Sequence, residues 1–255
     1  MDLAQIISGF AVGGIVGVTG VGGGALMTPL LLLVFGVAPA TAVGTDLLVA
    51  AITKSGGTWV HARQGTVDWR VVRLLASGSL PAAAATLLIV HLVFPAGLAG
   101  AGKLIGAVLG VALLLTAAAL ALRSRLQALA RSRAGTGDNA RLTVATGVVL
   151  GILVSISSVG AGAIGVSALL LLQPKLATSR VVGSDIAHAV PLALVAGLGH
   201  WWLGSIDGAL LASLLTGSLP GIWLGSRLAP RIPERFLRAG LAGMLILIGG
   251  KLIVA

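Results

Sequence analysis

The chain has 255 residues, of which 57% are hydrophobic and only 9% charged, and its mean hydropathy is +1.08. Soluble proteins carry about 25% charged residues, so this composition excludes a water-soluble globular protein. The net charge of +10 does not indicate nucleic-acid binding, because the basic residues lie between apolar runs, where positive charge sets membrane orientation.

Ten apolar runs follow one another along the chain, in two sets of five. They lie at about residues 3–20, 22–36, 40–61, 69–93 and 99–122, and then at about 141–158, 160–173, 178–200, 207–228 and 235–254. Most are long enough for a helix to cross a hydrocarbon core of about 30 Å. The second run of each set has only about 13 to 15 residues and predicts a half-helix or one arm of a re-entrant hairpin. The expected fold class is an all-α, polytopic transmembrane helical bundle.

The longest polar connection is rich in arginine and should lie in the cytoplasm, because basic loops resist translocation. Alternating spans then place most other basic loops on the same side and both termini outside. The expected organisation is an N-terminal repeat at residues 1–122, a cytoplasmic linker at 123–140 and a C-terminal inverted repeat at 141–255.

The second half of the sequence repeats the first at an offset of 139 residues. The matches are Gly44-Thr45-Asp46 with Gly183-Ser184-Asp185, His61 with His200, Asp68 with Asp207, and Gly78-Ser79-Leu80-Pro81 with Gly217-Ser218-Leu219-Pro220. An odd number of segments per copy inverts the second copy in the membrane. Inverted repeats are the architecture of secondary transporters, since two symmetric halves provide one conformation open to each side. The repeat therefore predicts transport by alternating access, with a duplication kept for folding alone as the alternative.

Glycine clusters begin both short segments, and they align with each other at an offset of 138 residues. Paired short segments of this kind point to the binding site of a transporter. The first turn of a helix leaves unpaired N–H groups and a partial positive charge, which attract anions. Alternatively, the glycines only permit close helix packing. The candidate substrate-binding residues here are Gly22, Gly23, Gly24, Thr28, Pro29, Ser158, Gly160, Gly162 and Ser167.

Several polar side chains lie inside the apolar spans. The candidates for coupling or gating are Asp46, Asp185, His188, Thr45 and Ser184. An intramembrane carboxylate is expected to carry a proton or bind an ion, although it can also satisfy the backbone of a broken helix. Lys54, a further substrate-binding candidate, either meets an anion directly or reaches back to the interface. No metal site and no cofactor are expected.

The residues that lead into Met27-Thr28-Pro29-Leu30-Leu31, followed by Ala42-Val43-Gly44-Thr45-Asp46, resemble the sulfite exporter TauE/SafE family. The resemblance covers nearly the whole chain; its first motif matches Gly22, Gly23, Gly24 and Pro29, and the second copy matches Gly160 and Gly162 but departs at Ala161 and Ser167. It implies a permease that exports sulfite, sulfonates such as sulfoacetate, or related sulfur oxyanions, in the plasma membrane of a prokaryote.

A cation or divalent-metal transporter is the alternative function, with Asp46, Asp185, His188 and His200 as oxygen and imidazole ligands. An intramembrane hydrolase is not expected, because the sequence has neither a G-x-S-x-G elbow nor an H-E-x-x-H helix. The expected partners are a small anionic substrate and the lipid bilayer, with a homodimer as the expected assembly.

Overall fold

The computed structural model of the chain describes residues 2–19, 24–94, 102–132, 139–228 and 234–254, and the regular structure in these ranges is α-helical. The helices are α1 (Leu3–Thr19), α2 (Gly24–Leu33), α3 (Pro39–Arg63), α4 (Trp69–Val93), α5 (Gly102–Ala121), α6 (Arg123–Ser132), α7 (Ala140–Ser157), α8 (Ala163–Leu172), α9 (Thr178–Trp202), α10 (Gly208–Leu228) and α11 (Glu234–Val254). Five of them, α4, α5, α7, α9 and α10, are long and apolar enough to cross a membrane. The predicted fold class, a polytopic helical membrane bundle, is therefore confirmed.

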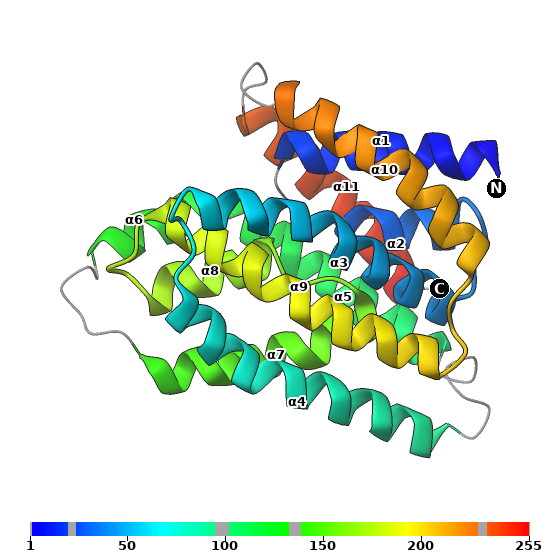
Figure 1. Ribbon diagram of the computed structural model, residues 1–255, viewed down its shortest axis with the longest axis horizontal. Helices are drawn as coiled ribbons and strands as arrows, with labels where there is room; N and C mark the ends of the chain where they lie inside the picture. The colour runs from blue at the N-terminus through cyan, green and yellow to red at the C-terminus, as the bar shows by residue number, and fades with distance from the viewer. Residues whose placement is uncertain (1, 20–23, 95–101, 133–138, 229–233, 255) are drawn as a thin grey trace.

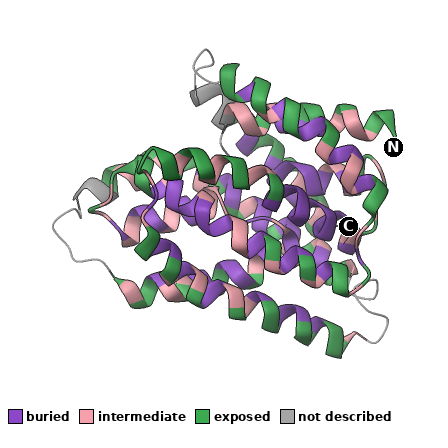
Figure 2. Cartoon of the chain, in the orientation of Figure 1, coloured by how far each residue is buried: buried purple, intermediate pink, exposed green. Residues whose placement is uncertain are grey.

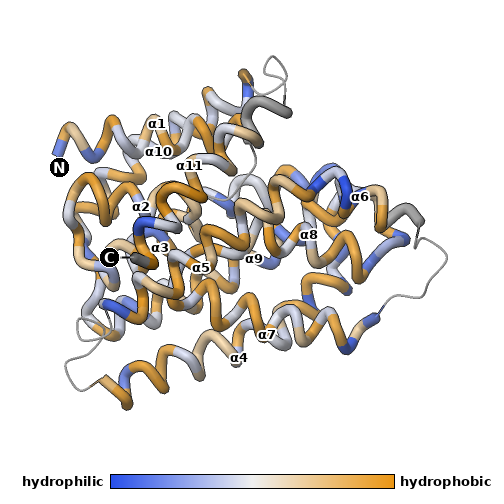
Figure 3. Tube along the Cα trace, turned by 180° about the vertical axis from the view of Figure 1, so that it is seen from behind, coloured by the Kyte–Doolittle hydropathy of each residue, from blue (hydrophilic) through white to orange (hydrophobic). Residues whose placement is uncertain are grey.

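Each predicted apolar run corresponds to one helix, and the structure adds α6 in the polar connection after α5. The backbone passes from α5 into α6 through Leu122, whose carbonyl oxygen accepts from the N–H of Leu126 at 2.9 Å. Figure 3 shows hydrophilic residues gathered at α6, in contrast to the mostly apolar spans. Apolar runs do not predict this helix, because its sequence, Arg123–Ser132, is rich in arginine and other polar residues. The division of the chain at residues 122 and 140 stays a prediction.

The two short helices are half-helices. α2 and α8 have 10 residues each, which at 1.5 Å per residue gives about 15 Å, half of a hydrocarbon core. Buried residues gather in the middle of the molecule, whereas α1 and α4 at its edges carry many exposed positions (Figure 2). Exposed side chains such as Leu92 and Leu247 are apolar, as expected for side chains in contact with lipid.

The two sets of helices interlock. α1 packs against α10, α4 packs against α7, and α3 lies beside α9 between these pairs (Figure 1). A side-chain carbon added to Gly13 would overlap the backbone of Ser218, and one added to Gly151 would overlap the backbone of Ser79. These two contacts join equivalent positions of the sequence repeat. Glycine allows such close approach of transmembrane helices, so the helix packing follows the repeat residue by residue.

Candidate functional site

The starts of the two short helices meet inside the bundle. Gly24 begins α2, and a side chain on it would overlap the backbone oxygen of Ser158, in the turn before α8. This turn is irregular, with positive φ at Ser158 (58°), Gly160 (135°) and Gly162 (120°). Non-helical backbone at membrane depth occurs only inside protein or beside a cavity, which marks this turn as a functional candidate. Two predicted residues lie outside the described ranges, Gly22 and Gly23.

Asp46 on α3 joins three segments at this meeting point. Thr28 Oγ1 on α2 donates to Asp46 Oδ2 at 2.6 Å, and Ser158 Oγ donates to the same oxygen at 2.9 Å. The side chain of Asp46 is buried, with 1% of the residue exposed. The two hydroxyls that were predicted to bind substrate therefore converge on a carboxylate oxygen.

Asp185 on α9 is the repeat equivalent of Asp46, but its surroundings differ. The residue is 1% exposed, and neither carboxylate oxygen has a hydrogen-bond partner among the described residues. A side chain added to Gly165, in the first turn of α8, would overlap Asp185 Oδ1. The backbone N–H of Gly162 lies near the carboxylate without completing a hydrogen bond. The carboxylate of Asp185 thus lies against the start of α8.

Lys54 on α3 reaches toward the second half of the sequence. Its Nζ donates to the backbone oxygen of Ala161 at 3.4 Å, in the turn that precedes α8. The ammonium interacts electrostatically with both Asp46 and Asp185. The structure thus directs this side chain to the glycine-rich turn of the other half. We define the central cluster as Gly24, Thr28, Asp46, Lys54, Ser158, Gly162, Gly165 and Asp185.

Other predicted site residues make their hydrogen bonds outside the central cluster. Ser167 Oγ donates at 2.7 Å to a backbone oxygen one turn earlier in its own helix. His188 Nε2 lies 2.7 Å from Ser79 Oγ on α4, and Pro29 is buried within α2. The structure therefore brings together the helix starts, the aspartates and the lysine. His188 interacts electrostatically with that lysine, whereas Ser167 bonds only to its own helix.

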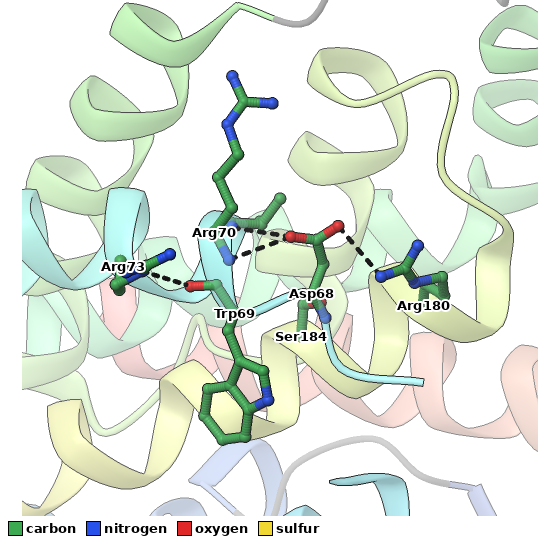
Figure 4. A network of polar contacts seen from close by, with 7 residues as sticks. Asp68, Trp69, Arg70, Arg73, Arg180 and Ser184 are labelled. Atoms are coloured by element: carbon green, nitrogen blue, oxygen red, sulfur yellow. Dashed lines mark hydrogen bonds and ion pairs between the residues drawn. The ribbon is translucent and has the colours of Figure 1, made fainter. Parts of the chain in front are cut away.

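The connection between α3 and α4 fastens α4 to α9 (Figure 4). Asp68 caps α4 by accepting from the N–H groups of Arg70 at 3.1 Å and Val71 at 3.3 Å. The N–H of Asp68 donates to Ser184 Oγ on α9 at 2.8 Å, and Arg180 Nη2 lies 3.4 Å from Asp68 Oδ2. Ser184, predicted as a coupling residue, therefore holds this corner, which we call the α3–α4 corner.

The equivalent connection between α9 and α10, the α9–α10 corner, lacks these fastenings. Asp207 caps α10 by accepting from two backbone N–H groups at 2.9 and 3.0 Å. However, Thr45, the equivalent of Ser184, buries an Oγ1 that has no partner within the described part of the chain. Position 41, the equivalent of Arg180, is a threonine. The side-chain hydrogen bond and the ion pair are thus present at one corner and absent from the described part of the other, where Ile206 packs against Gly44 of α3.

Three residues at these contacts, Gly165, Arg180 and Asp68, are not among the predicted site residues. Gly165 carries no signal of its own until Asp185 is found against it. Arg180 was interpreted only as an orientation charge, and Asp68 only as a match in the repeat. The hydrogen bond from Asp68 to Ser184 joins residues 116 positions apart, which no local pattern reveals.

Comparison with known proteins agrees with this architecture. The family model "Sulfite exporter TauE/SafE" matches residues 5–252. The chain is 41% identical to the probable membrane transporter protein YjnA of Bacillus subtilis, over 99% of the chain and 100% of the relative. It is 29% identical to the probable membrane transporter protein YdhB of the same organism, over 93% of the chain and 97% of the relative. No solved structure matches with significance. The chain is therefore a membrane transporter and not an enzyme, and it belongs to the sulfite exporter TauE/SafE family.

Proposed function

We propose that this transporter exports small sulfur oxyanions, such as sulfite or organosulfonates, across the plasma membrane of a prokaryote by alternating access. One observation carries the proposal: the starts of two half-helices from opposite halves of the sequence meet inside the bundle, beside Asp46 and Ser158. Paired broken helices of this kind form the substrate sites of inverted-repeat transporters. A homodimeric assembly is also part of the proposal.

The chemistry of the central cluster fits an oxyanion. Helix starts present N–H groups and a partial positive charge without the high cost of a buried, unpaired ion. The hydroxyls of Thr28 and Ser158 converge at 2.6 and 2.9 Å on one oxygen of Asp46. These two hydroxyls hold Asp46 in place beside the helix starts, which leaves the N–H groups of the helix starts to bind a sulfite or sulfonate oxygen. Lys54 adds a positive charge beside the turn.

The difference between the two corners supports alternating access. In an inverted repeat, each half adopts the other's conformation when the transporter switches. At the α3–α4 corner, Asp68 donates to Ser184. After the switch, the N–H of Asp207 would donate to Thr45 Oγ1, which is now buried without a partner among the described residues. The hydrogen bond between Asp68 and Ser184 in this conformation would then be replaced by the equivalent bond between Asp207 and Thr45 in the other.

Cation transport fits the geometry less well. His188 Nε2 is engaged by Ser79 at 2.7 Å, and His200 Nε2 lies 2.9 Å from the backbone oxygen of Ser155. The histidines therefore do not converge on the aspartates. Among the described residues, no group of three or more His, Cys, Asp or Glu side chains is placed to hold a metal ion.

The test is flux into liposomes that contain the purified full chain. Labelled sulfite and sulfoacetate should enter saturably, whereas a labelled divalent cation should not. Gly162→Ala should slow oxyanion flux by about tenfold or more, equivalent to ~1.4 kcal/mol of barrier, because it distorts the start of α8. Gly204→Ala is the matched control, since Gly204 also has positive φ (70°) but has open space around it. Cation flux without oxyanion flux would contradict the proposal.

A further inference from the structure

The anion-attracting start of α8 already faces an anionic group of the protein. The N-cap residue of this ten-residue helix is Gly162, and no side chain caps the helix start. The carboxylate of Asp185 packs directly against Gly165 in the first turn, and neither of its oxygens has a hydrogen-bond partner among the described residues. A residue that is 1% exposed thus directs two unpartnered oxygens at the place where an oxyanion would bind.

We propose that Asp185 is an internal competitor of the substrate. In this mechanism, the ionised carboxylate holds the start of α8, and the substrate anion replaces it only when one proton has neutralised Asp185. Each singly charged oxyanion therefore crosses the membrane together with one proton. This inference rests on the proposed function, because it concerns the same site.

The charges of the central cluster favour the binding of one proton together with each anion. With all groups ionised, Asp46, Asp185 and Lys54 together carry one negative charge. A bound monoanion would double it in a buried region, where an uncompensated charge costs several kcal/mol. One proton on Asp185 restores the original balance. A dianion would require a second proton, so the site should select monoanions.

Asp185 rather than Asp46 is the group that exchanges the proton. Asp46 accepts from the hydroxyls of Thr28 and Ser158, which stabilise its ionised form. Asp185 has no such donors, because the position equivalent to Thr28 is Val166. The Asp185 carboxylate has only the start of α8 and Lys54 near it, and without hydroxyl donors it is the more easily neutralised of the two.

None of the other titratable groups on the helices around Asp185 bonds to its carboxylate among the described contacts. His188 on α9 contacts Ser79 through Nε2 and interacts electrostatically with Lys54, while its Nδ1 has no partner within the described residues. His200, also buried on α9, contacts the backbone oxygen of Ser155. Asp68 beside α4 is paired with Arg180, and His61 near the end of α3 contacts Thr66 at 2.8 Å. The remaining charges on these helices lie toward their ends and are exposed: Arg63 on α3, Arg70, Arg73 and His91 on α4, and Arg141 on α7. α8 has no titratable side chain. Lys54 is thus the counter-ion of Asp185.

The proton follows a balanced route. It comes from water on the open side and binds one oxygen of Asp185, and the neutral carboxyl group leaves the N–H groups of α8 to the anion. After the switch, the anion departs on the other side, the proton leaves Asp185, and the carboxylate returns to the helix start. No covalent bond of the substrate changes.

The test uses the full chain in liposomes and labelled methanesulfonate, a strong acid whose single charge is constant between about pH 5 and pH 9. A pH-sensitive dye inside the liposomes should show one proton entering per anion. Apparent affinity should fall by up to about tenfold per pH unit as pH rises through the titration of Asp185, as one-proton linkage requires. D185N should bind with an affinity that does not depend on pH and should move no proton. D207N is the control, because Asp207 lies outside the central cluster and asparagine keeps the oxygen that caps α10, so this variant should keep the pH dependence.

The outcomes separate this inference from the proposed function. Absence of flux for sulfite, sulfoacetate and methanesulfonate alike would overturn the proposed function. Anion flux without proton movement, or pH dependence retained in D185N, would overturn only the competitor role of Asp185. If D185N does not fold, the wild-type protein in weakly buffered detergent solution decides the question. Addition of methanesulfonate should then remove one proton from solution per bound anion, and uptake of none would overturn the inference.

Discussion

The two intramembrane aspartates occupy equivalent positions but have opposite surroundings. Asp46 accepts two hydroxyl hydrogen bonds, one of them from Thr28. Asp185 accepts none from the described residues, and Val166 stands where the repeat has Thr28. The duplication has kept the backbone and the carboxylate in both halves, whereas the hydroxyl donors have diverged. The two carboxylates therefore have equivalent positions in the repeat but different hydrogen-bond donors, which is the difference on which the proposed role of Asp185 depends.

The two corners also occupy equivalent positions in the repeat and differ in their side-chain contacts. The α3–α4 corner is closed by Ser184 and Arg180, both of which contact Asp68. The α9–α10 corner has the equivalent aspartate and a hydroxyl residue, Thr45, but no hydrogen bond between them among the described contacts. Under the proposed alternating access, the two conformations would differ in a few hydrogen bonds at these corners, so single substitutions should shift the balance between them.

The largest expected effect is a loss of stability, and it tests the glycine contacts that the two halves share. Gly13→Val and Gly151→Val should each destabilise the protein by about 1–3 kcal/mol or prevent folding, because the new side chain overlaps the backbone of Ser218 or Ser79. The melting temperature and the size-exclusion profile in detergent would measure this. Gly106→Val on α5 is the control, since nothing lies within 4 Å of that position. If only one of the two variants is destabilised, the packing does not follow the repeat.

The sequence predicted the helices better than it predicted the site. The run at 69–93 agrees with α4, because an apolar stretch follows the capping residue Asp68. The contact between Asp46 and Ser158 spans 112 positions and depends on which side of each helix faces inward. In a membrane helix both the lipid-facing and the buried sides are apolar, so hydrophobic periodicity does not show this orientation. The repeat predicted equivalent positions, but not which of them touch.

Removal of one hydroxyl at either corner should have an intermediate effect, with opposite sign at the two corners. Ser184→Ala removes the acceptor of the Asp68 N–H and should favour opening of the α3–α4 corner by about 0.5–1.5 kcal/mol, or roughly two- to tenfold. Thr45→Ala should act in the opposite direction, because Thr45 would form its hydrogen bond only after the switch.

The natural chain contains no cysteine, so single reporter cysteines can follow this change. Val67→Cys and Ile206→Cys occupy equivalent positions at the two corners, and a water-soluble maleimide would label whichever corner is open. Ser184→Ala should speed labelling at position 67 and slow it at 206. Equal labelling changes at both positions would mean that the substitution loosens the protein without shifting the alternation.

The smallest expected effect is that of the ion pair between Arg180 and Asp68, which is described at the α3–α4 corner and has no equivalent at the α9–α10 corner, where position 41 is a threonine. Arg180 is 45% exposed, so its 3.4 Å contact with Asp68 should contribute no more than about 1 kcal/mol. Thr41→Arg would give Asp207 the equivalent partner and should slow labelling of Ile206→Cys by up to about fivefold at low salt. The effect should weaken at high salt, because exposed charges are screened. Thr41→Gln is the control, with a long side chain but no charge. If glutamine acts as strongly as arginine, side-chain bulk rather than charge holds the corner, and the absence of an arginine at position 41 does not explain why the two corners differ.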